Sequence, residues 1–197
     1  MCTFPITIKL CLLIQCFSSM FSEFNNLVGY IPTEIGLLTK LRFWGMERGK
    51  LTGTIPTEIA ALSNLEFLDL DFNQLTGSLT TELLSLRNLT QLDLNDNKLT
   101  GSINGIGVFP NMLFLQLHDN MFTGTVPSEV GTFSNLGAFT LHETLISGIM
   151  PESVCNLLAN NVPTNVGKLT SLIADCAGES PAVDCLCCTE CRPLPIS

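Results

Sequence analysis

Positive charge is scarce in this 197-residue chain, which carries 9 Lys and Arg against 18 Asp and Glu. The net charge of −9 argues against a nucleic-acid partner, because phosphate binding needs clustered Lys and Arg. No apolar run reaches the roughly 18 residues of a membrane span, so we expect no transmembrane segment. The apolar fraction of 46% excludes a disordered chain, and the length suits a single domain with a substantial core.

Cysteine is absent between Cys16 and Cys155, although the chain contains nine. Residues 10–17 form an apolar stretch of the length found in signal peptides, so residues 1–18 are interpreted as a signal peptide or an unreliable start. Cleavage near Ser18 removes three cysteines and leaves an even number. Paired cysteines suit an oxidising compartment, and we therefore expect an extracellular or cell-surface location. The six that remain are Cys155, Cys176, Cys185, Cys187, Cys188 and Cys191.

Internal repetition determines the expected architecture. Six glycines recur at intervals of 24, 24, 24, 23 and 24 residues, at Gly29, Gly53, Gly77, Gly101, Gly124 and Gly148. An upstream element keeps step with them, as in Leu65-x-x-Leu68-x-Leu70-x-x-Asn73. Together they spell LxxLxLxxNxLTGxIPxEIGxLxx, which resembles the plant-type leucine-rich repeat over roughly residues 17–175.

This resemblance implies an α/β leucine-rich-repeat solenoid, a right-handed curved coil with short 3-10 or α turns on its convex side. Alternation of Leu68 and Leu70 predicts a short strand with one buried face, and stacked strands form a parallel concave sheet. The repeated asparagines are expected to bond turn backbone, and the glycines to need positive φ or close approach. Residues 19–154 are predicted to form about six repeats, and residues 155–197 an altered last repeat and a cysteine-rich cap.

The ending of the chain, with its closely spaced cysteines, is similar to secreted repeat proteins that are abundant in diatoms. Three disulfides are the favoured interpretation, and six cysteines allow 15 pairings, among which the sequence does not choose. A zinc site lacks a second Cys-x-x-Cys and a nearby histidine. A redox pair at Cys188 and Cys191 lacks the βαβ setting it needs.

No cofactor, metal or catalytic activity is predicted, because the chain has no nucleophile elbow, phosphate loop or His-Glu-x-x-His motif. His118 and His142 fall in equivalent positions one coil apart, about 5 Å from each other. A metal is disfavoured there, since stacked strands hold side chains parallel and do not direct them to one point.

The best functional signal is an acidic stripe with interleaved aromatics on the expected concave face. We predict that it binds a protein, peptide or glycan ligand, and its acidic charge suits a basic one. The expected protein is a receptor-like module without a kinase domain that signals through a co-receptor. A structural role in wall or matrix is the alternative. The predicted ligand-binding residues, all placed in solvent-facing positions, are Phe67, Asp69, Asp71, Phe72, Asp93, Asn95, Asp96, Phe114, Gln116, His118, Asp119, His142 and Glu143.

Two further surface features have weaker functional interpretations. Asn88-Leu-Thr90 is a glycosylation sequon, which is used only if the chain is secreted. Thr52, Thr76, Thr100 and Thr123 are expected to stack in register, as in a flat ice-binding array. The same threonine belongs to the ordinary repeat, so ice binding is a minor alternative.

Overall fold

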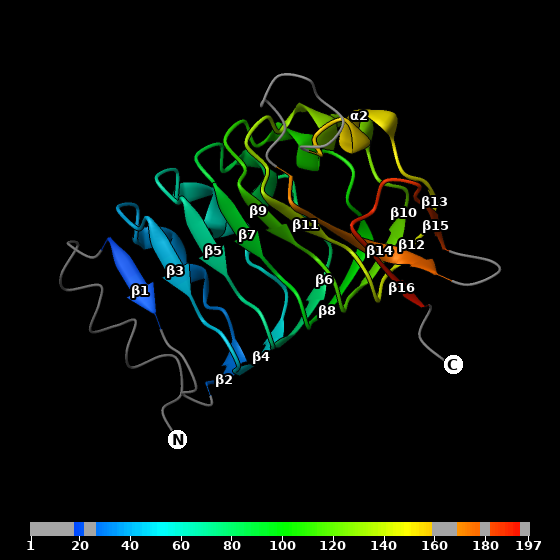
Figure 1. Cartoon of the computed structure of the whole chain (residues 1–197). Coiled ribbons are helices and arrows are strands. Elements are labelled where there is room, and N and C mark those ends of the chain that lie inside the picture. The colour runs from blue at the N-terminus through cyan, green and yellow to red at the C-terminus, as the bar shows by residue number, and fades with distance from the viewer. Residues whose placement is uncertain (1–17, 22–26, 159–168, 178–181, 194–197) are drawn as a thin grey trace.

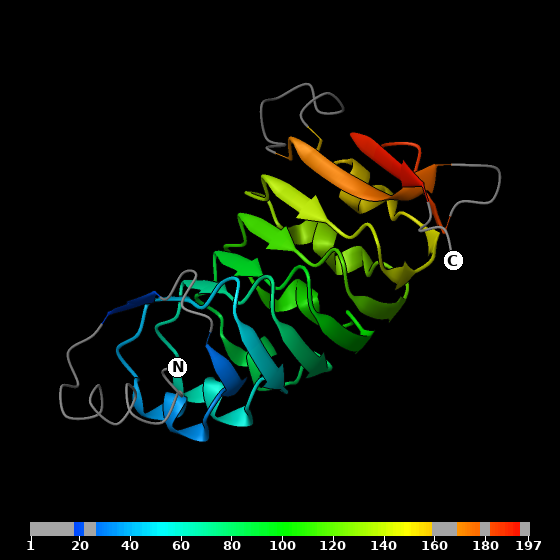
Figure 2. The same ribbon diagram turned by 90° about the horizontal axis from the view of Figure 1, so that it is seen from below.

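The computed structural model describes residues 18–21, 27–158, 169–177 and 182–193, and shows a curved stack of coils (Figures 1 and 2). Within these residues, eight parallel strands form the concave sheet. In spatial order they are β1 (Ser19–Phe21), β3 (Phe43–Gly45), β5 (Phe67–Asp69), β7 (Gln91–Asp93), β9 (Phe114–Gln116), β11 (Ala138–Thr140), β14 (Ser171–Ala177) and β16 (Glu190–Pro193). The predicted solenoid and its parallel sheet are confirmed.

A second parallel sheet runs along the side of the stack, and short helical turns connect the two sheets. Its strands are β2 (Val28–Tyr30), β4 (Lys50–Gly53), β6 (Gln74–Gly77), β8 (Lys98–Ser102), β10 (Met121–Gly124) and β12 (Leu145–Ile146). The turns are η1 (Thr33–Leu37), η2 (Thr57–Ala61), η3 (Leu83–Ser85), η4 (Ile106–Val108), η5 (Ser128–Thr132) and α2 (Glu152–Cys155). Apart from α2 these are 3-10 turns, as the repeat implies. None of the described helices is long and apolar enough to cross a membrane.

A large apolar residue at the centre of each concave strand from β3 to β11 pairs with its equivalent in the next coil, and this stacking forms a continuous core. Leu68 pairs with Leu92, and Leu92 with Leu115, at the centre of the concave sheet. All three are fully buried. Burial at about 25 cal/mol per Å² of apolar surface explains why the middle of the chain folds without covalent cross-links.

Asparagines that are buried or partly buried connect successive coils. Asn73 accepts a bond from the Leu51 N–H (3.0 Å) and donates to the Met46 carbonyl (2.7 Å), both in the preceding coil. It also donates to the carbonyls of Leu70 and Asp71 in its own turn. Asn97 and Asn120 make the same set of bonds in the next two coils. The expected turn ladder is therefore present, and it also joins adjacent coils.

The repeated glycines have the backbone geometry that the sequence predicts. All six have positive φ, as at Gly77 (φ 85°). A Cβ atom on Gly77 would lie 2.8 Å from Thr54 Cγ2, so both the conformation and the space require glycine there.

The threonine array does not form as expected. Neighbouring strands of the second sheet pair with a shift relative to the repeat, so Thr76 faces Lys98 and Thr100 faces Met121. Thr52 likewise faces Gln74, and Thr123 faces Leu145. Residues of other repeat positions therefore lie opposite the threonines, so the threonines do not stack in register with one another.

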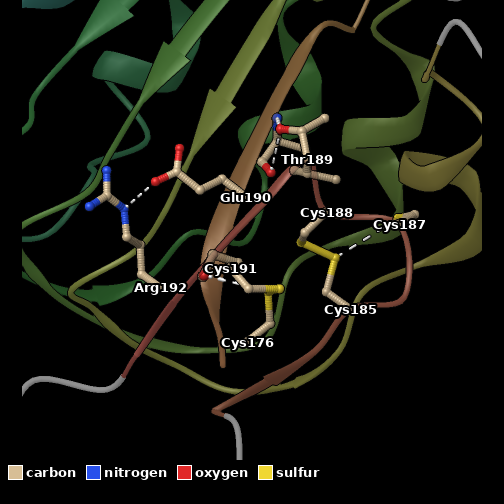
Figure 3. Close-up of a disulfide and its surroundings, with 10 residues drawn as sticks. Cys176, Cys185, Cys187, Cys188, Thr189, Glu190, Cys191 and Arg192 are labelled. Atoms are coloured by element: carbon tan, nitrogen blue, oxygen red, sulfur yellow. Dashed lines mark hydrogen bonds and ion pairs between the residues drawn. A yellow bond between two sulfur atoms is a disulfide. The ribbon is translucent and has the colours of Figure 1, made fainter. Parts of the chain in front are cut away.

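The cysteine-rich tail extends the concave sheet and contributes to a separate two-stranded sheet. β16 extends the concave sheet beyond β14, and β15 (Val183–Asp184) pairs with β13 (Gly148–Ile149). The sequence predicts a cap without a repeat period, but not that the tail imitates part of another coil. The disulfides join Cys155 to Cys187, Cys176 to Cys191 and Cys185 to Cys188. Figure 3 shows the last two of these bonds.

Residues 1–17 of the predicted leader lie outside the described residues. Ser18, its last residue, already takes part in the solenoid. Its carbonyl oxygen accepts bonds from the N–H groups of Arg42 (2.8 Å) and Phe43 (3.0 Å).

Replacement of Asn73 tests the asparagine ladder. We expect Asn73→Ala to lower the free energy of unfolding by about 3 kcal/mol, because it leaves buried peptide groups without partners. Chemical denaturation measures this change. Asn88→Ala is the matched control: Asn88 is exposed and donates one bond, to the Ser63 carbonyl, so its loss should cost less than about 1 kcal/mol. Equal costs at the two positions would contradict the role of the ladder.

The three disulfides should differ in their contribution to stability. Loop-closure entropy predicts about 3–4 kcal/mol for Cys155–Cys187, which spans 32 residues, and about 2 kcal/mol for Cys185–Cys188, which spans 3. Paired Cys→Ala replacements, compared by denaturation under oxidising conditions, give the order directly. A larger loss for the shorter loop would show that the cap is not stabilised in this way.

Candidate functional site: the concave face

The register of the concave sheet arranges the predicted site residues in columns. The first column contains Phe43, Phe67, Gln91 and Phe114, and the second contains Asp69, Asp93, Gln116 and Thr140. A third column lies just beyond the C-terminal ends of the strands. It contains, in successive coils, Glu47, Asp71, Asn95, His118 and His142. Because the pairing keeps equivalent positions together, the structure groups carboxylates at the N-terminal half and imidazoles nearer the cap.

Asp69, Asp71 and Asp93 form a cluster in which one oxygen of each lies within 4.8 Å of the others. Asp69 and Asp93 are only 8% and 5% exposed. Asp69 Oδ1 accepts a bond from the Asp71 N–H (3.1 Å). Asp93 accepts bonds from the Asn95 N–H (3.2 Å), the Asn95 side chain and Gln116 Nε2. The Asp69 and Asp93 carboxylates therefore accept hydrogen bonds from residues of their own coil, and Asp93 also accepts one from the next coil.

Four of the predicted residues lack the solvent exposure expected for them. Asp69, Asp93, Asn95 and His142 are buried, because local hydrogen bonds and neighbouring coils cover them. Phe72 and Phe114 are exposed as expected (42% and 44%), and so is Glu143. The remaining predicted residues are partly exposed, namely Phe67, Asp71, Asp96, Gln116, His118 and Asp119.

Burial shifts the acidity of the cluster strongly. It raises the pKa of Asp69 to about 8 and that of Asp93 to about 7, and nearby carboxylates add to both shifts. Burial and the charge of Glu47 raise the pKa of Asp71 to about 6. At neutral pH the cluster therefore holds protons that isolated carboxylates would have lost.

Aromatic and basic side chains border the carboxylates. The Phe21 and Phe67 rings meet edge to face, with centroids 5.9 Å apart. The Arg48 guanidinium lies 4.7 Å from the centre of the Phe72 ring. Beside the same sheet, the Arg42 guanidinium donates two hydrogen bonds to the Glu66 carboxylate, each 2.8 Å long. The face thus presents apolar area next to acidic groups, a combination that suits a side chain with an apolar stem and a cationic end.

The His118 and His142 rings stack, with centroids 4.4 Å apart and planes 14° from parallel. His118 Nδ1 lies 2.8 Å from the Thr140 hydroxyl, and His118 Nε2 lies 3.9 Å from the Asp119 carboxylate. Burial and the neighbouring His142 lower the pKa of His118 to about 4. Burial and Arg192 lower the pKa of His142 as well. Both imidazoles are therefore neutral at pH 7.

One position per coil adopts a left-handed backbone that sequence reasoning missed. The φ angle is positive at Arg48, Phe72, Asp96, Asp119 and Glu143, where the chain turns away from the concave sheet. Each residue directly precedes the asparagine position of its repeat, so its place in the period is the available signal. These turns direct Asp119 back toward the ring of His118.

Comparison with known proteins agrees with this architecture. The Leucine Rich Repeat family model matches residues 64–86 and 88–108. The leucine-rich-repeat ectodomain of the receptor kinase SOBIR1 from Arabidopsis thaliana is 30% identical, over 65% of this chain and 70% of that one, with a TM-score of 0.61. The chain belongs to the leucine-rich-repeat family.

Two other solved structures resemble this leucine-rich-repeat protein over most of its length. The ectodomain of the receptor kinase GASSHO1/SCHENGEN3 from Arabidopsis thaliana, in complex with CASPARIAN STRIP INTEGRITY FACTOR 2, is 28% identical with a TM-score of 0.76. The plant peptide hormone receptor RGFR1, in complex with RGF2, is 26% identical with a TM-score of 0.75. The match covers 93% and 88% of this chain but only 20% and 26% of those chains. A search of curated proteins finds no significant match.

The sequon of this leucine-rich-repeat protein lies on an exposed turn. Asn88 is exposed, and its amide donates a bond to the Ser63 carbonyl (2.8 Å). The Thr90 hydroxyl donates to the Glu66 carbonyl (3.0 Å). The asparagine is therefore accessible at the surface, and its glycosylation stays a prediction.

The raised pKa of Asp69 predicts how stability depends on pH. A carboxyl whose pKa is higher in the folded state binds more protons there, so the stability it confers is lost as pH rises from about 4 to 8. Asp69→Asn keeps the acceptor for the Asp71 N–H and removes the titration. We expect the variant to be at least about 1 kcal/mol more stable than the native protein near pH 8 and unchanged near pH 4. Denaturation at several pH values measures this, and parallel pH profiles for the two proteins would contradict the assignment.

Proposed function

We propose that this chain is a non-catalytic, receptor-like recognition module that binds a cationic peptide or protein segment on its concave face outside the cell. The observation that carries the proposal is the cluster of Asp69, Asp71 and Asp93 beside partly exposed aromatics. A ligand ammonium or guanidinium would supply the positive charge that the buried carboxylates lack, while its stem packs on the Phe67 and Phe114 rings.

Two independent features support an extracellular ligand-binding role. The three disulfides of the cap are stable in an oxidising compartment. Similar ectodomains are seen in complex with peptide ligands, as in RGFR1 with RGF2. Signalling through a co-receptor belongs to the same proposal. A glycan at Asn88 would be compatible with the proposal, since Asn88 lies outside the proposed concave site.

Protonation of the cluster gives the proposal a specific signature. A bound cation favours the ionised carboxylates, so binding should release protons and become tighter as pH rises from about 5 to 8. The charged groups closest to the cluster are Glu47, Arg48 and Asp96. Of these, Arg48 opposes a cationic ligand, and its contact with Phe72 holds it to one side.

Selection from a random peptide library, followed by calorimetry on the selected peptides, tests the proposal. We expect enrichment of Lys or Arg next to aromatic or aliphatic residues. Combined Asp71→Asn and Asp96→Asn replacements should weaken binding about tenfold or more, because both carboxyls are partly exposed and their loss leaves the core intact.

Glu129→Gln is the matched control, since Glu129 is an exposed acid on the convex turn η5 and should leave affinity unchanged. Calorimetry in buffers of different ionisation enthalpy counts the protons released. Selected peptides without positive charge, or equal binding to the concave and convex variants, would sink the proposal. Self-association of the protein without any peptide binding would favour the structural role in wall or matrix.

A further inference from the structure

We propose that His118, His142 and Asp119 form a binding site for a divalent transition-metal ion such as Zn²⁺ at the cap-proximal end of the concave face. The site is separate from the carboxylate cluster and does not depend on the proposed peptide ligand. It uses residues of two adjacent coils, which follow β9 and β11.

The three side chains bring a suitable set of atoms together. One nitrogen of each imidazole and one oxygen of Asp119 lie within 4.8 Å of one another. Tetrahedral zinc, with bonds of about 2.0–2.1 Å, needs its ligand atoms roughly 3.3 Å apart. The ligand atoms therefore need to approach by at most about 1.5 Å, a distance within the reach of small χ rotations of side chains at a partly exposed surface.

The left-handed turn at Asp119 removes the objection that stacked strands hold side chains parallel. Parallel strands alone would give two imidazoles side by side, as the ring stacking shows. The positive φ of Asp119 (53°) returns the chain so that its carboxylate lies 3.9 Å from His118 Nε2. A third donor therefore approaches the ring edge from a different direction.

Hydrogen bonding around the rings favours a metal ligand role. The Thr140 hydroxyl occupies His118 Nδ1, which fixes the ring and leaves Nε2 free, as second-shell partners of metal-bound histidines do. His142 is 9% exposed, and its Nδ1 has no hydrogen-bond partner among the described residues. A buried, unpaired imidazole nitrogen costs free energy that a bonded partner would recover.

The charge balance near the site favours a cation. The carboxylates of Asp119 and Glu143 add negative charge beside the imidazoles, and the fourth coordination position is left to water. Arg192 is the opposing charge, and its guanidinium is engaged by Glu190 at 2.8 Å. Two imidazoles with carboxylate oxygen suit Zn²⁺, Ni²⁺ or Cu²⁺, whereas Ca²⁺ and Mg²⁺ prefer oxygen ligands alone.

Zinc titration of the oxidised full-length protein by calorimetry tests the site. We expect one Zn²⁺ per chain, and about tenfold or greater loss of affinity in His142→Gln and in Asp119→Asn. Asp96→Asn is the matched control: Asp96 holds the same left-handed turn position one coil earlier, so its loss changes local charge without removing a ligand. Its affinity should stay within about threefold of the native value.

Cobalt substitution gives a second measurement on the unaltered protein. Bound Co²⁺ should show visible d–d bands without the thiolate charge-transfer band that cysteine ligands would add, and should broaden the NMR signals of both imidazoles. Circular dichroism confirms that each variant is folded. Undiminished zinc binding by His142→Gln, an equal loss in Asp96→Asn, or unbroadened imidazole signals at saturating Co²⁺ would overturn the proposal.

Discussion

Three successive coils of this solenoid are each attached to the coil before by an asparagine, Asn73, Asn97 or Asn120, that bonds the backbone of both. The bonds from Asn73 to the Met46 carbonyl and from the Leu51 N–H require that one coil follow the next at a fixed offset. An asparagine can satisfy these peptide groups only if the turn before it has the same shape in every coil. The left-handed residue before each asparagine is a consequence of that shape. The register of the concave sheet, and hence the positions of its side chains, depends on this one interaction.

Fixed register has an energetic consequence on the concave face. Equivalent positions pair directly, so a sequence that repeats Asp at one position places Asp69 beside Asp93. Like charges at this spacing repel, and burial makes the ionised forms costlier still. Protonation of the carboxylates reduces this cost, and so do the hydrogen bonds that the Asn95 and Gln116 side chains donate to Asp93. A face that is unfavourable when empty gains more from a matching cation than an ordinary acidic surface would.

The solenoid could be predicted from the sequence because the residues that recur in each repeat each require one particular backbone or packing environment. Gly77 needs positive φ, Leu68 and Leu70 need a buried strand face, and Asn73 needs a turn to bond. The side-chain environment was harder to predict. Alternation assigns Asp69 and His142 to the outward face correctly, yet local hydrogen bonds and the neighbouring coils bury them there. The shifted pairing of strands in the second sheet was not predicted. The repeat length shows which residues are equivalent in successive coils, but it does not show which residues pair across neighbouring strands. Disulfide connectivity depends on how the tail packs as an additional partial coil against β14. The tail has no repeat period from which this packing could be predicted.

The two halves of the concave face respond to protons in opposite directions. The raised pKa values of Asp69 and Asp93 mean that this half loses stability as pH rises from about 4 toward 8. The lowered pKa of His118 means that the other half loses stability as pH falls from about 6.5 to 4, because the unfolded chain then binds the extra proton. A cation bound among the carboxylates would reverse the first trend by favouring their ionised forms, and a metal ion on the imidazoles would deepen the second by competing with protons. Opposite proton responses on one rigid sheet follow from the same register that groups acids at one end and histidines at the other.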